Sequence, residues 1–242
     1  IDTQNENQIE NLINNFLIEK NSFIFESVEK GYIKGRYTIF GRNPDKIWEF
    51  NKNNCTLRVK NKKQKLKGTP KENIEKIIEE FNFKTPKELP PICSLISGYF
   101  SYDIIRYVEK IPNNNIDDLN IPDSRILRPK NLVIHDNIKK KLYFIVNVFK
   151  DEIIENLDLK YNEIIDQIEQ MVFLANYAQF IENEKKFKNL IKIKSNISKK
   201  KFLNNVQKAK KYIKIGDIFQ VVLSQRFETR LSKKPLEIYK KL

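Results

Sequence analysis

Residues 209–227 read AKKYIKIGDIFQVVLSQRF, a lysine-rich segment followed by a glycine and an apolar run. Before the glycine, apolar residues recur at helical spacing from Phe202 to Ile213, and Ser198 is a typical residue to cap such a helix. Gly216 stands where a glycine commonly ends a helix. From Asp217 to Phe227 apolar and polar side chains alternate, which predicts a β-strand. Only one further helix, starting at Pro235, follows, so we expect the sheet of this strand to be incomplete and the chain to be a fragment.

The segments upstream predict a mixture of helices and strands. Residues 7–19 have apolar residues at helical spacing, and residues 22–28 and 32–41 have the alternation and composition of strands. Residues 46–59 read as a hairpin that turns at NKNN, residues 51–54. Thr69 and Glu72 form the sequence pattern of a capping box, which predicts a helix that runs to about Phe81.

The pattern of alternating elements continues to the middle of the chain. We expect a strand over 93–100, a helical turn over 102–106, a hairpin that joins 132–135 to 142–149, and a long helix over 152–180. These elements together predict an α+β fold of mixed, largely antiparallel sheets with packed helices.

Composition excludes several classes of protein. The chain has 242 residues, of which 40% are hydrophobic and 11% aromatic, so it has enough apolar material to form a core. No uncharged apolar run is long enough to cross a bilayer, and residues 1–20 do not resemble a secretory signal, so we expect no membrane association and a cytoplasmic location. The only cysteines, Cys55 and Cys93, form no metal-ligand pattern with the single histidine, His135.

The formal net charge of +14 raises the question of nucleic-acid binding. Of the 45 cationic side chains only 8 are arginines, the residue best suited to bidentate phosphate contacts. The densest lysine run, 199–214, coincides with the amphipathic helix before Gly216, where lysines occupy the solvated side. We therefore predict no nucleic-acid partner.

Three segments together resemble the large subunit of anthranilate synthase, component I, within the chorismate-utilising enzymes. The strongest is 209–227, quoted above. The second is SGYFSYDIIRYVEKIP at 97–112, followed by LNIPDSRILRP at 119–129, and the third is FIFESVEKGYIKGRYTIFG at 23–41. Phe219 and the Val221–Val222 pair favour anthranilate synthase over aminodeoxychorismate synthase component I, and Ile24–Phe25 replace a Leu-Leu pair of the family.

The resemblance implies an activity, a cofactor and partners. Component I converts chorismate and ammonia into anthranilate and pyruvate with Mg²⁺, a glutamine amidotransferase subunit (component II) delivers the ammonia, and L-tryptophan inhibits the enzyme. The family's catalytic residues and metal ligands lie in its C-terminal half, so the resemblance assigns no catalytic or metal-binding residue to this chain. We expect a lyase of tryptophan biosynthesis that acts as a hetero-oligomer, and we expect this chain alone to be inactive.

The resemblance also implies a tryptophan-binding site at Glu26 and Ser27, with Arg36 as a further member. A carboxylate can accept hydrogen bonds from the ammonium group of an amino acid, and a hydroxyl can bond either end of it. From the residues alone, Glu26 reads as a solvent-facing strand residue and Ser27 as a turn former, and only the resemblance favours a ligand site.

The resemblance divides the chain into three parts. It leaves two alternative functions open. Residues 1–150 correspond to the regulatory N-terminal domain of a two-domain, β-sandwich-like architecture, 151–197 to a long helix and linker, and 198–242 to the beginning of the chorismate-binding domain. The alternatives are aminodeoxychorismate synthase component I and a non-catalytic tryptophan sensor.

Overall fold

The computed structural model describes residues 1–3, 7–26, 35–81, 84–114, 116–152, 154–177, 192–231, 233 and 235–241. The chain divides into two compact units, Ile1–Phe180 and Ile181–Leu242, and each is described by itself. Among the described residues, no helix is long and apolar enough to cross a membrane.

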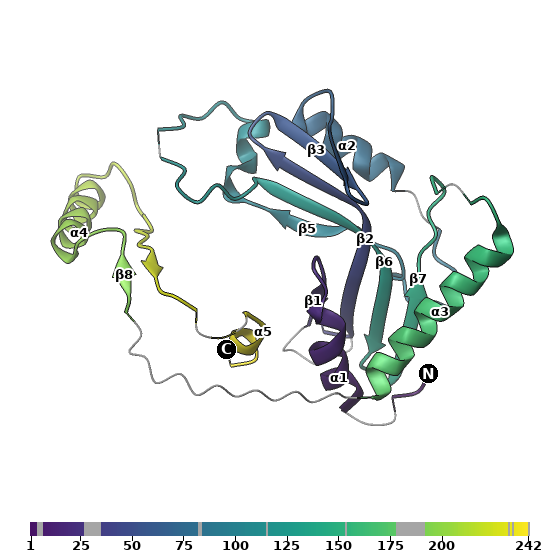
Figure 1. The fold of residues 1–242 in the computed structure, drawn as a ribbon. Helices are drawn as coiled ribbons and strands as arrows, with labels where there is room; N and C mark the ends of the chain where they lie inside the picture. Colours follow the sequence, from purple (N-terminus) through teal and green to yellow (C-terminus); the bar gives the residue numbers. More distant parts are fainter. Residues whose placement is uncertain are drawn as a thin grey trace. The chain divides into compact units, whose positions relative to one another are not determined.

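The first unit is built on two long antiparallel strands, β2 (Tyr37–Asn51) and β6 (Ser124–Asp136) (Figure 1). Their register runs from Tyr37 opposite Asp136 to Phe50 opposite Ser124, and it shifts by one residue between Pro44 and Lys46. The extra residue in this β-bulge is Asp45. Because side chains alternate between the faces of a strand, the bulge changes which residues of β2 lie on each face.

Five shorter strands complete the antiparallel sheet on either side of the bulge. The order is β4-β3-β2-β6-β5, with β1 on β2 and β7 on β6. β1 and β7 pair with the half of β2 and β6 that contains Gly41 and Leu132, while β3 and β5 pair with the half that contains Trp48 and Ile126. The shorter strands are β1 (Phe23–Phe25), β3 (Asn54–Val59), β4 (Lys62–Lys65), β5 (Ser97–Phe100) and β7 (Lys141–Val146).

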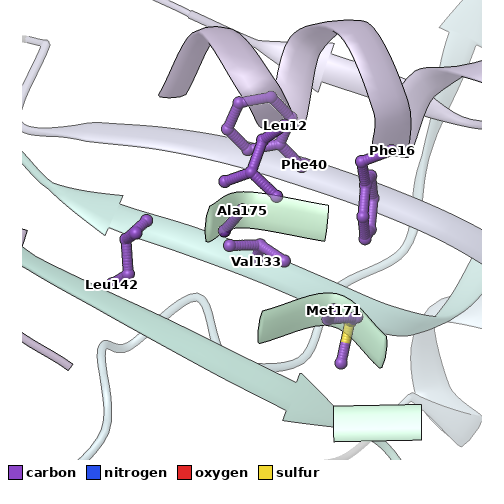
Figure 2. Close-up of a cluster of buried hydrophobic side chains, with 7 residues drawn as sticks. All are labelled: Leu12, Phe16, Phe40, Val133, Leu142, Met171 and Ala175. Atoms are coloured by element: carbon purple, nitrogen blue, oxygen red, sulfur yellow. The ribbon is translucent and has the colours of Figure 1, made fainter. Parts of the chain in front are cut away.

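Helices α1 (Asn7–Asn15) and α3 (Leu157–Asn176) cover one face of the first half of the sheet, with the short 3₁₀ helix η1 (Phe16–Ile18) after α1. Figure 2 shows the cluster that they bury against the strands. Its fully or almost fully buried members are Leu12, Phe16, Phe40, Val133, Leu142, Met171 and Ala175. Burial of each of its leucine, phenylalanine, valine and methionine side chains contributes about 1.5–3 kcal/mol, so this cluster fixes both helices on the sheet.

The second half of the sheet packs against α2 (Pro70–Glu80) through Trp48, Phe50 and Ile77. The predicted capping box is present: the Thr69 hydroxyl accepts from the Glu72 N–H, and the Glu72 carboxylate accepts from the Thr69 N–H. A third cluster, centred on Cys93, Leu132, Ile134 and Ile145, is covered by the segment 89–95.

Two predicted elements of the first unit begin several residues later than expected. The strand predicted over 93–100 begins only at Ser97, because the Cys93 N–H donates to the Pro90 carbonyl in a turn. The helix predicted over 152–180 is α3, which begins after its cap Asn156. The Glu152 carboxylate accepts from the Phe149 N–H and pairs with Lys130, which keeps 149–152 in a turn. The six-residue 3₁₀ helix η2 (Tyr102–Tyr107) confirms the predicted helical turn.

The second unit contains β8 (Lys194–Ser195), α4 (Lys199–Lys214), β9 (Phe227–Glu228) and α5 (Pro235–Tyr239). The predicted cap is confirmed, because the Ser198 hydroxyl accepts from the Lys201 N–H and Gly216 follows the helix at φ +85°. The predicted strand over Asp217–Phe227 is wrong in this chain. Only Phe227 and Glu228 pair, with Ser195 and Lys194, since the described residues offer no longer strand to complete a ladder.

Candidate functional site

The proposed tryptophan site begins where β1 ends. β1 pairs with β2 in the register Phe23 to Gly41, Ile24 to Phe40 and Phe25 to Ile39. Both ends of the segment 23–41, which carries one of the three resemblances, therefore lie side by side in the sheet. Glu26 directly follows β1 and is exposed, whereas Ser27 lies outside the described residues.

A close approach of β1 to β2 depends on Gly41. A Cβ atom at position 41 would lie 2.2 Å from Cζ of Phe23, so the ring occupies the space that any side chain would need. The Phe23 ring lies 5.0 Å from the Phe25 ring, centroid to centroid, at an interplanar angle of 43°. On the opposite side of β1, Ile24 packs against the cluster of Figure 2. These contacts fix the end of β1 and, with it, the backbone position of Glu26.

The end of β1 combines an exposed carboxylate with an aromatic ring. Phe25 keeps 47% of its surface exposed and immediately precedes Glu26 in the chain. The two side chains are neighbours in the sequence, and each by itself suits one part of an amino acid, the ring an apolar body and the carboxylate an ammonium group. The chemistry at Glu26 is thus compatible with an amino acid.

Arg36, the third predicted site residue, makes a different set of contacts. Its Nε and Nη2 donate to the Asp136 carboxylate, at 3.2 and 2.7 Å from Oδ2, and its guanidinium carbon lies 4.9 Å from the centroid of the Tyr37 ring. Asp136 also accepts from the N–H groups of Ile138 and Lys139. Burial opposes ionisation of Asp136, but the bonds from Arg36 and from these N–H groups outweigh it and lower the pKa of the carboxyl. In the structure Arg36 therefore holds the beginning of β2 against the end of β6. Its place in a ligand pocket stays a prediction.

The second segment of the resemblance is also brought together by strand pairing. β5, from SGYF, lies antiparallel to the start of β6, from PDSRILRP, with Ser97 opposite Leu127 and Phe100 opposite Ser124. The Ser124 hydroxyl donates to the Tyr99 carbonyl. Asp123 accepts from the Tyr107 hydroxyl at 2.9 Å and from the Lys52 N–H at 2.6 Å. The contacts of this motif therefore hold β5, the start of β6 and η2 in place within the first unit.

Charged side chains beside the bulge form a cluster for which the sequence analysis had no signal. Arg128 pairs with Asp45 in the bulge and with Asp151, which also pairs with Lys46. The Arg128 guanidinium carbon lies 3.9 Å from the centroid of the Phe149 ring. Burial raises the pKa of Asp151, but hydrogen bonds from Lys46 and Arg128 more than offset this, and the net pKa is lowered. The cluster ties the segment before α3 to β2 and β6.

Two further residues, His135 and Arg106, could suggest catalysis. Neither lies in a catalytic arrangement. His135 is buried near the end of β6, opposite Thr38 and Leu142, as expected for a strand residue. Arg106 donates to Asp103 at 2.8 Å and to the carbonyl of Pro112 at 2.9 Å, so η2 uses this arginine to hold the loop that follows. In the part of the chain that the structure describes, no group of three or more His, Cys, Asp or Glu side chains could hold a metal ion.

The third segment of the resemblance, 209–227, lies in the second unit. The Gln225 side-chain amide donates to the Ser195 hydroxyl at 2.7 Å, and Arg226 Nε donates to Glu228 at 2.8 Å. Between Gly216 and Gln225 the backbone forms no strand, and Phe219 is 94% exposed. The residues that carry the strongest resemblance thus lie at the surface of this chain.

Comparison with known proteins identifies the relationship that the three segments indicate. The sequence model of the family described as chorismate binding enzyme matches residues 21–242. The chain belongs to the chorismate binding enzyme family. This match confirms the resemblance to chorismate-utilising enzymes that the motifs at 23–41, 97–129 and 209–227 predicted.

Individual members of the chorismate binding enzyme family are similar over most of the chain. Anthranilate synthase component 1 of Acetivibrio thermocellus is 36% identical over 227 residues, which are 91% of this chain and 45% of that relative. Anthranilate synthase component 1 of Cereibacter sphaeroides is 30% identical over 91% of the chain and 45% of the relative. The chain spans about half the length of these curated relatives.

A solved structure shows that the fold is shared as well. Anthranilate synthase component I from Streptococcus pneumoniae TIGR4 matches with a TM-score of 0.66 and 21% identity, over 93% of this chain and 48% of that chain. The predicted α+β class with largely antiparallel sheets is therefore confirmed.

Proposed function

We propose that this chain supplies part of the large subunit of anthranilate synthase, the lyase that converts chorismate and ammonia into anthranilate and pyruvate. The observation that carries the proposal is the 36% identity over 91% of the chain to a protein named anthranilate synthase component 1. Phe219, Val221 and Val222 lie in the segment that favours anthranilate synthase over aminodeoxychorismate synthase. The reaction begins tryptophan synthesis, and we place it in the cytoplasm.

We further propose that the chain alone does not turn over chorismate. The exposure of Phe219 and the missing strand at 217–226 support this, because a substrate site built on a sheet needs that sheet to be formed. The resemblance places the catalytic groups in the part of the relatives' length that this chain does not span. We therefore assign no catalytic residue to the chain.

Mg²⁺ and an ammonia-delivering subunit belong to the same proposal. Mg²⁺ takes carboxylate oxygens and would supply charge stabilisation to the leaving hydroxyl of chorismate. The described residues include no cluster of acidic side chains suited to it, so we derive no step of the reaction through the metal here. The ammonia would come from a glutamine amidotransferase subunit, component II, in a hetero-oligomer.

Feedback inhibition by L-tryptophan is the regulatory part of the proposal, with Glu26 and Ser27 as the contacts. The support in this chain is the exposed position of Glu26, which directly follows the half-exposed Phe25 at the end of β1. A carboxylate accepts charge-assisted hydrogen bonds from an ammonium group. Arg36, which pairs with Asp136, is the third proposed member of this site.

The test is complementation in trans. The chain is mixed with the portion of the Acetivibrio thermocellus relative that it does not span, produced as a separate polypeptide, and chorismate, ammonium and Mg²⁺ are added. We expect anthranilate fluorescence from the mixture and none from either polypeptide alone. Formation of non-fluorescent aminodeoxychorismate would favour the alternative synthase, and calorimetric binding of tryptophan without turnover of chorismate would favour a sensor.

A further inference from the structure

The β3–β4 hairpin leaves one edge of the sheet in the first unit open. β4 stands at the end of the strand order, pairs with β3 alone among the described strands, and has all four of its residues exposed. The Leu66 N–H donates to the Cys55 carbonyl at 2.8 Å, and hydrogen-bonded pairs alternate along an antiparallel ladder. By this alternation the N–H and C=O groups of Lys63 and Lys65 point away from β3. A further strand could bond to these groups.

The same edge carries a concentration of positive charge. Residues 51–71 contain eight cationic side chains and no acidic one, and three of the four residues of β4 are lysines. Lys63 pairs with Glu49 of β2 at 3.1 Å, whereas Lys62 and Lys65 form no ion pair with any residue that the structure describes. The edge therefore keeps a positive charge that the described residues do not neutralise.

Strand pairing gathers part of this charge on one face of the sheet. One row across β4, β3, β2 and β6 consists of Lys65, Thr56, Glu49 and Arg125. In the next row Arg58 lies directly opposite Lys63. Side chains in opposite positions of antiparallel strands share a face, and like charges there destabilise the pair. A carboxylate added beside Lys63 and Lys65 would relieve this repulsion.

The lysines are a property of this edge and not of the sheet's edges in general. Lysine on an edge strand prevents pairing with edges of the same charge. β5, at the other end of the strand order, reads SGYF, and β1 reads FIF, so neither carries a charge. On β5 even Phe100 is 58% exposed. Protection against edge pairing alone therefore does not explain why the charge lies on β4.

The chemistry of the edge selects one kind of partner. A second copy of β4 would bring lysines against lysines and is disfavoured. A nucleic acid offers phosphates, which accept hydrogen bonds but cannot donate to the outward carbonyls of Lys63 and Lys65. Only one of the eight cations, Arg58, is an arginine, and β4 has no aromatic ring on which a base could stack. A β-strand that carries carboxylates supplies donors, acceptors and negative charge together.

We propose that β4 is a docking edge for an extended acidic segment of another protein, which adds to the sheet as a further strand. The segment pairs through its backbone with the outward N–H and C=O groups of Lys63 and Lys65. Its carboxylates lie beside the side chains of these lysines and of Arg58. The proposal does not depend on the function proposed above, because it uses only the geometry and charge of the first unit.

The intact 242-residue chain and a synthetic peptide test the proposal. The probe is an eight-residue peptide with blocked ends in which glutamate and threonine alternate. We expect saturable binding by fluorescence anisotropy, and we expect exchange of the Lys63 and Lys65 amides with deuterium to slow by about tenfold or more, because a paired strand protects its amides. Binding that leaves exchange at these two amides unchanged overturns the proposal.

Two control ligands separate strand addition from attraction between charges. The same peptide with every backbone nitrogen methylated keeps its four carboxylates but has no backbone donor, so it should bind about tenfold more weakly or not at all. Equal affinity of the methylated and unmethylated peptides would overturn strand addition. Protection of the Lys63 and Lys65 amides by an oligouridylate, with none by the peptide, would overturn the proposal in favour of an RNA site.

Substitutions at Lys65 test the charge and the backbone separately. Lys65→Glu should weaken peptide binding by about tenfold, whereas Lys139→Glu, in the turn between β6 and β7, should leave it unchanged. Lys65→Pro removes the outward N–H as well as the charge, which an edge strand tolerates, and Lys65→Thr removes the charge alone. We expect Lys65→Pro to bind more weakly than Lys65→Thr. Equal binding by these two variants, with circular dichroism showing that both fold, would contradict backbone pairing at this edge.

Discussion

Arg36, directly before β2, and Asp136, at the end of β6, pair across 100 residues of sequence, with Nη2 of Arg36 2.7 Å from Oδ2 of Asp136. The Asp136 side chain is only 2% exposed, and it also accepts the N–H groups that begin the turn into β7. One carboxylate therefore joins β2, β6 and the β6–β7 turn. A residue singled out as a ligand contact proves to hold together the sheet that carries Glu26.

Arg36→Ala is expected to destabilise the first unit rather than to change ligand contacts directly. It leaves a buried carboxylate without its guanidinium partner, which costs about 1–3 kcal/mol. Urea denaturation followed by circular dichroism measures the loss. Arg36→Lys, which keeps the charge but not the two-point contact, should lose less. Loss of tryptophan binding in Arg36→Ala at unchanged stability would instead place Arg36 in the pocket.

Stability should fall at acidic pH through Asp136, Asp151 and Glu152. In each, burial alone would raise the pKa, but bonds from Arg36, from Lys46 and Arg128, or from Lys130 outweigh it and lower the pKa. The unfolded chain therefore binds protons at a higher pH than the folded chain. The free energy of unfolding is then greatest above the ordinary pKa values of about 4 and declines as the pH falls below them.

The measurement is a series of urea titrations between pH 7 and pH 3, with Asp136→Asn as the matched variant. Asparagine keeps an oxygen for the N–H groups of Ile138 and Lys139 but cannot titrate. We expect Asp136→Asn to be less stable than the native chain at neutral pH and the difference to shrink toward pH 3. A difference in the free energy of unfolding that stays constant across this range would show that Asp136 does not contribute to the loss of stability at acidic pH.

Local signals in the sequence predict the elements whose contacts are local. The capping box of α2 needs only Thr69 and Glu72, three residues apart, and the structure contains it. The hairpins that turn at 51–54 and 136–141 likewise follow from adjacent strands. Pairing between distant segments is different, because the partners of Arg128 at positions 45 and 151 have no mutual signal in the sequence.

The strand predicted over Asp217–Phe227 shows where a local pattern is not enough. Its alternation is a property of residues 217–227 alone, but a strand forms only when a second strand supplies hydrogen-bond partners. The described residues supply Lys194 and Ser195, and pairing extends no further than these. At the candidate site, the resemblance located Glu26, while the structure added what no pattern showed, the wedge of Phe23 over Gly41 that sets the end of β1.

Gly41→Ala should disturb the candidate site while the rest of the sheet survives. The added methyl group would lie 2.2 Å from Cζ of Phe23, so the ring must shift, and we expect β1 to pack less closely on β2. The expected cost is about 1–3 kcal/mol, typical of overpacking. In a complex that binds tryptophan, calorimetry should show weaker binding than for Thr38→Ser, a β2 control that keeps the backbone unchanged. Full tryptophan affinity in Gly41→Ala would show that tryptophan binding at Glu26 and Ser27 does not depend on the position of β1.

Gly98 and Gly216, which lie in the other two motifs, should respond to alanine for different reasons. At Gly98 a Cβ atom would lie 2.1 Å from the carbonyl oxygen of Arg125 and 2.9 Å from Cα of Ile126, both of them backbone atoms of β6 that cannot rotate away. Gly98→Ala therefore has to push β5 off β6, and overpacking predicts a loss of about 1–3 kcal/mol in the first unit.

At Gly216 no atom lies within 4 Å of the added methyl group, but φ is +85°. Gly216→Ala then costs only the strain of a left-handed residue, about 1–2 kcal/mol, and it acts on the end of α4. Urea denaturation, with hydrogen exchange to localise the loss, distinguishes the two. Gly216→Asn should recover part of the loss at 216, because asparagine tolerates the left-handed region, whereas Gly98→Asn should be worse than Gly98→Ala, because position 98 is limited by space.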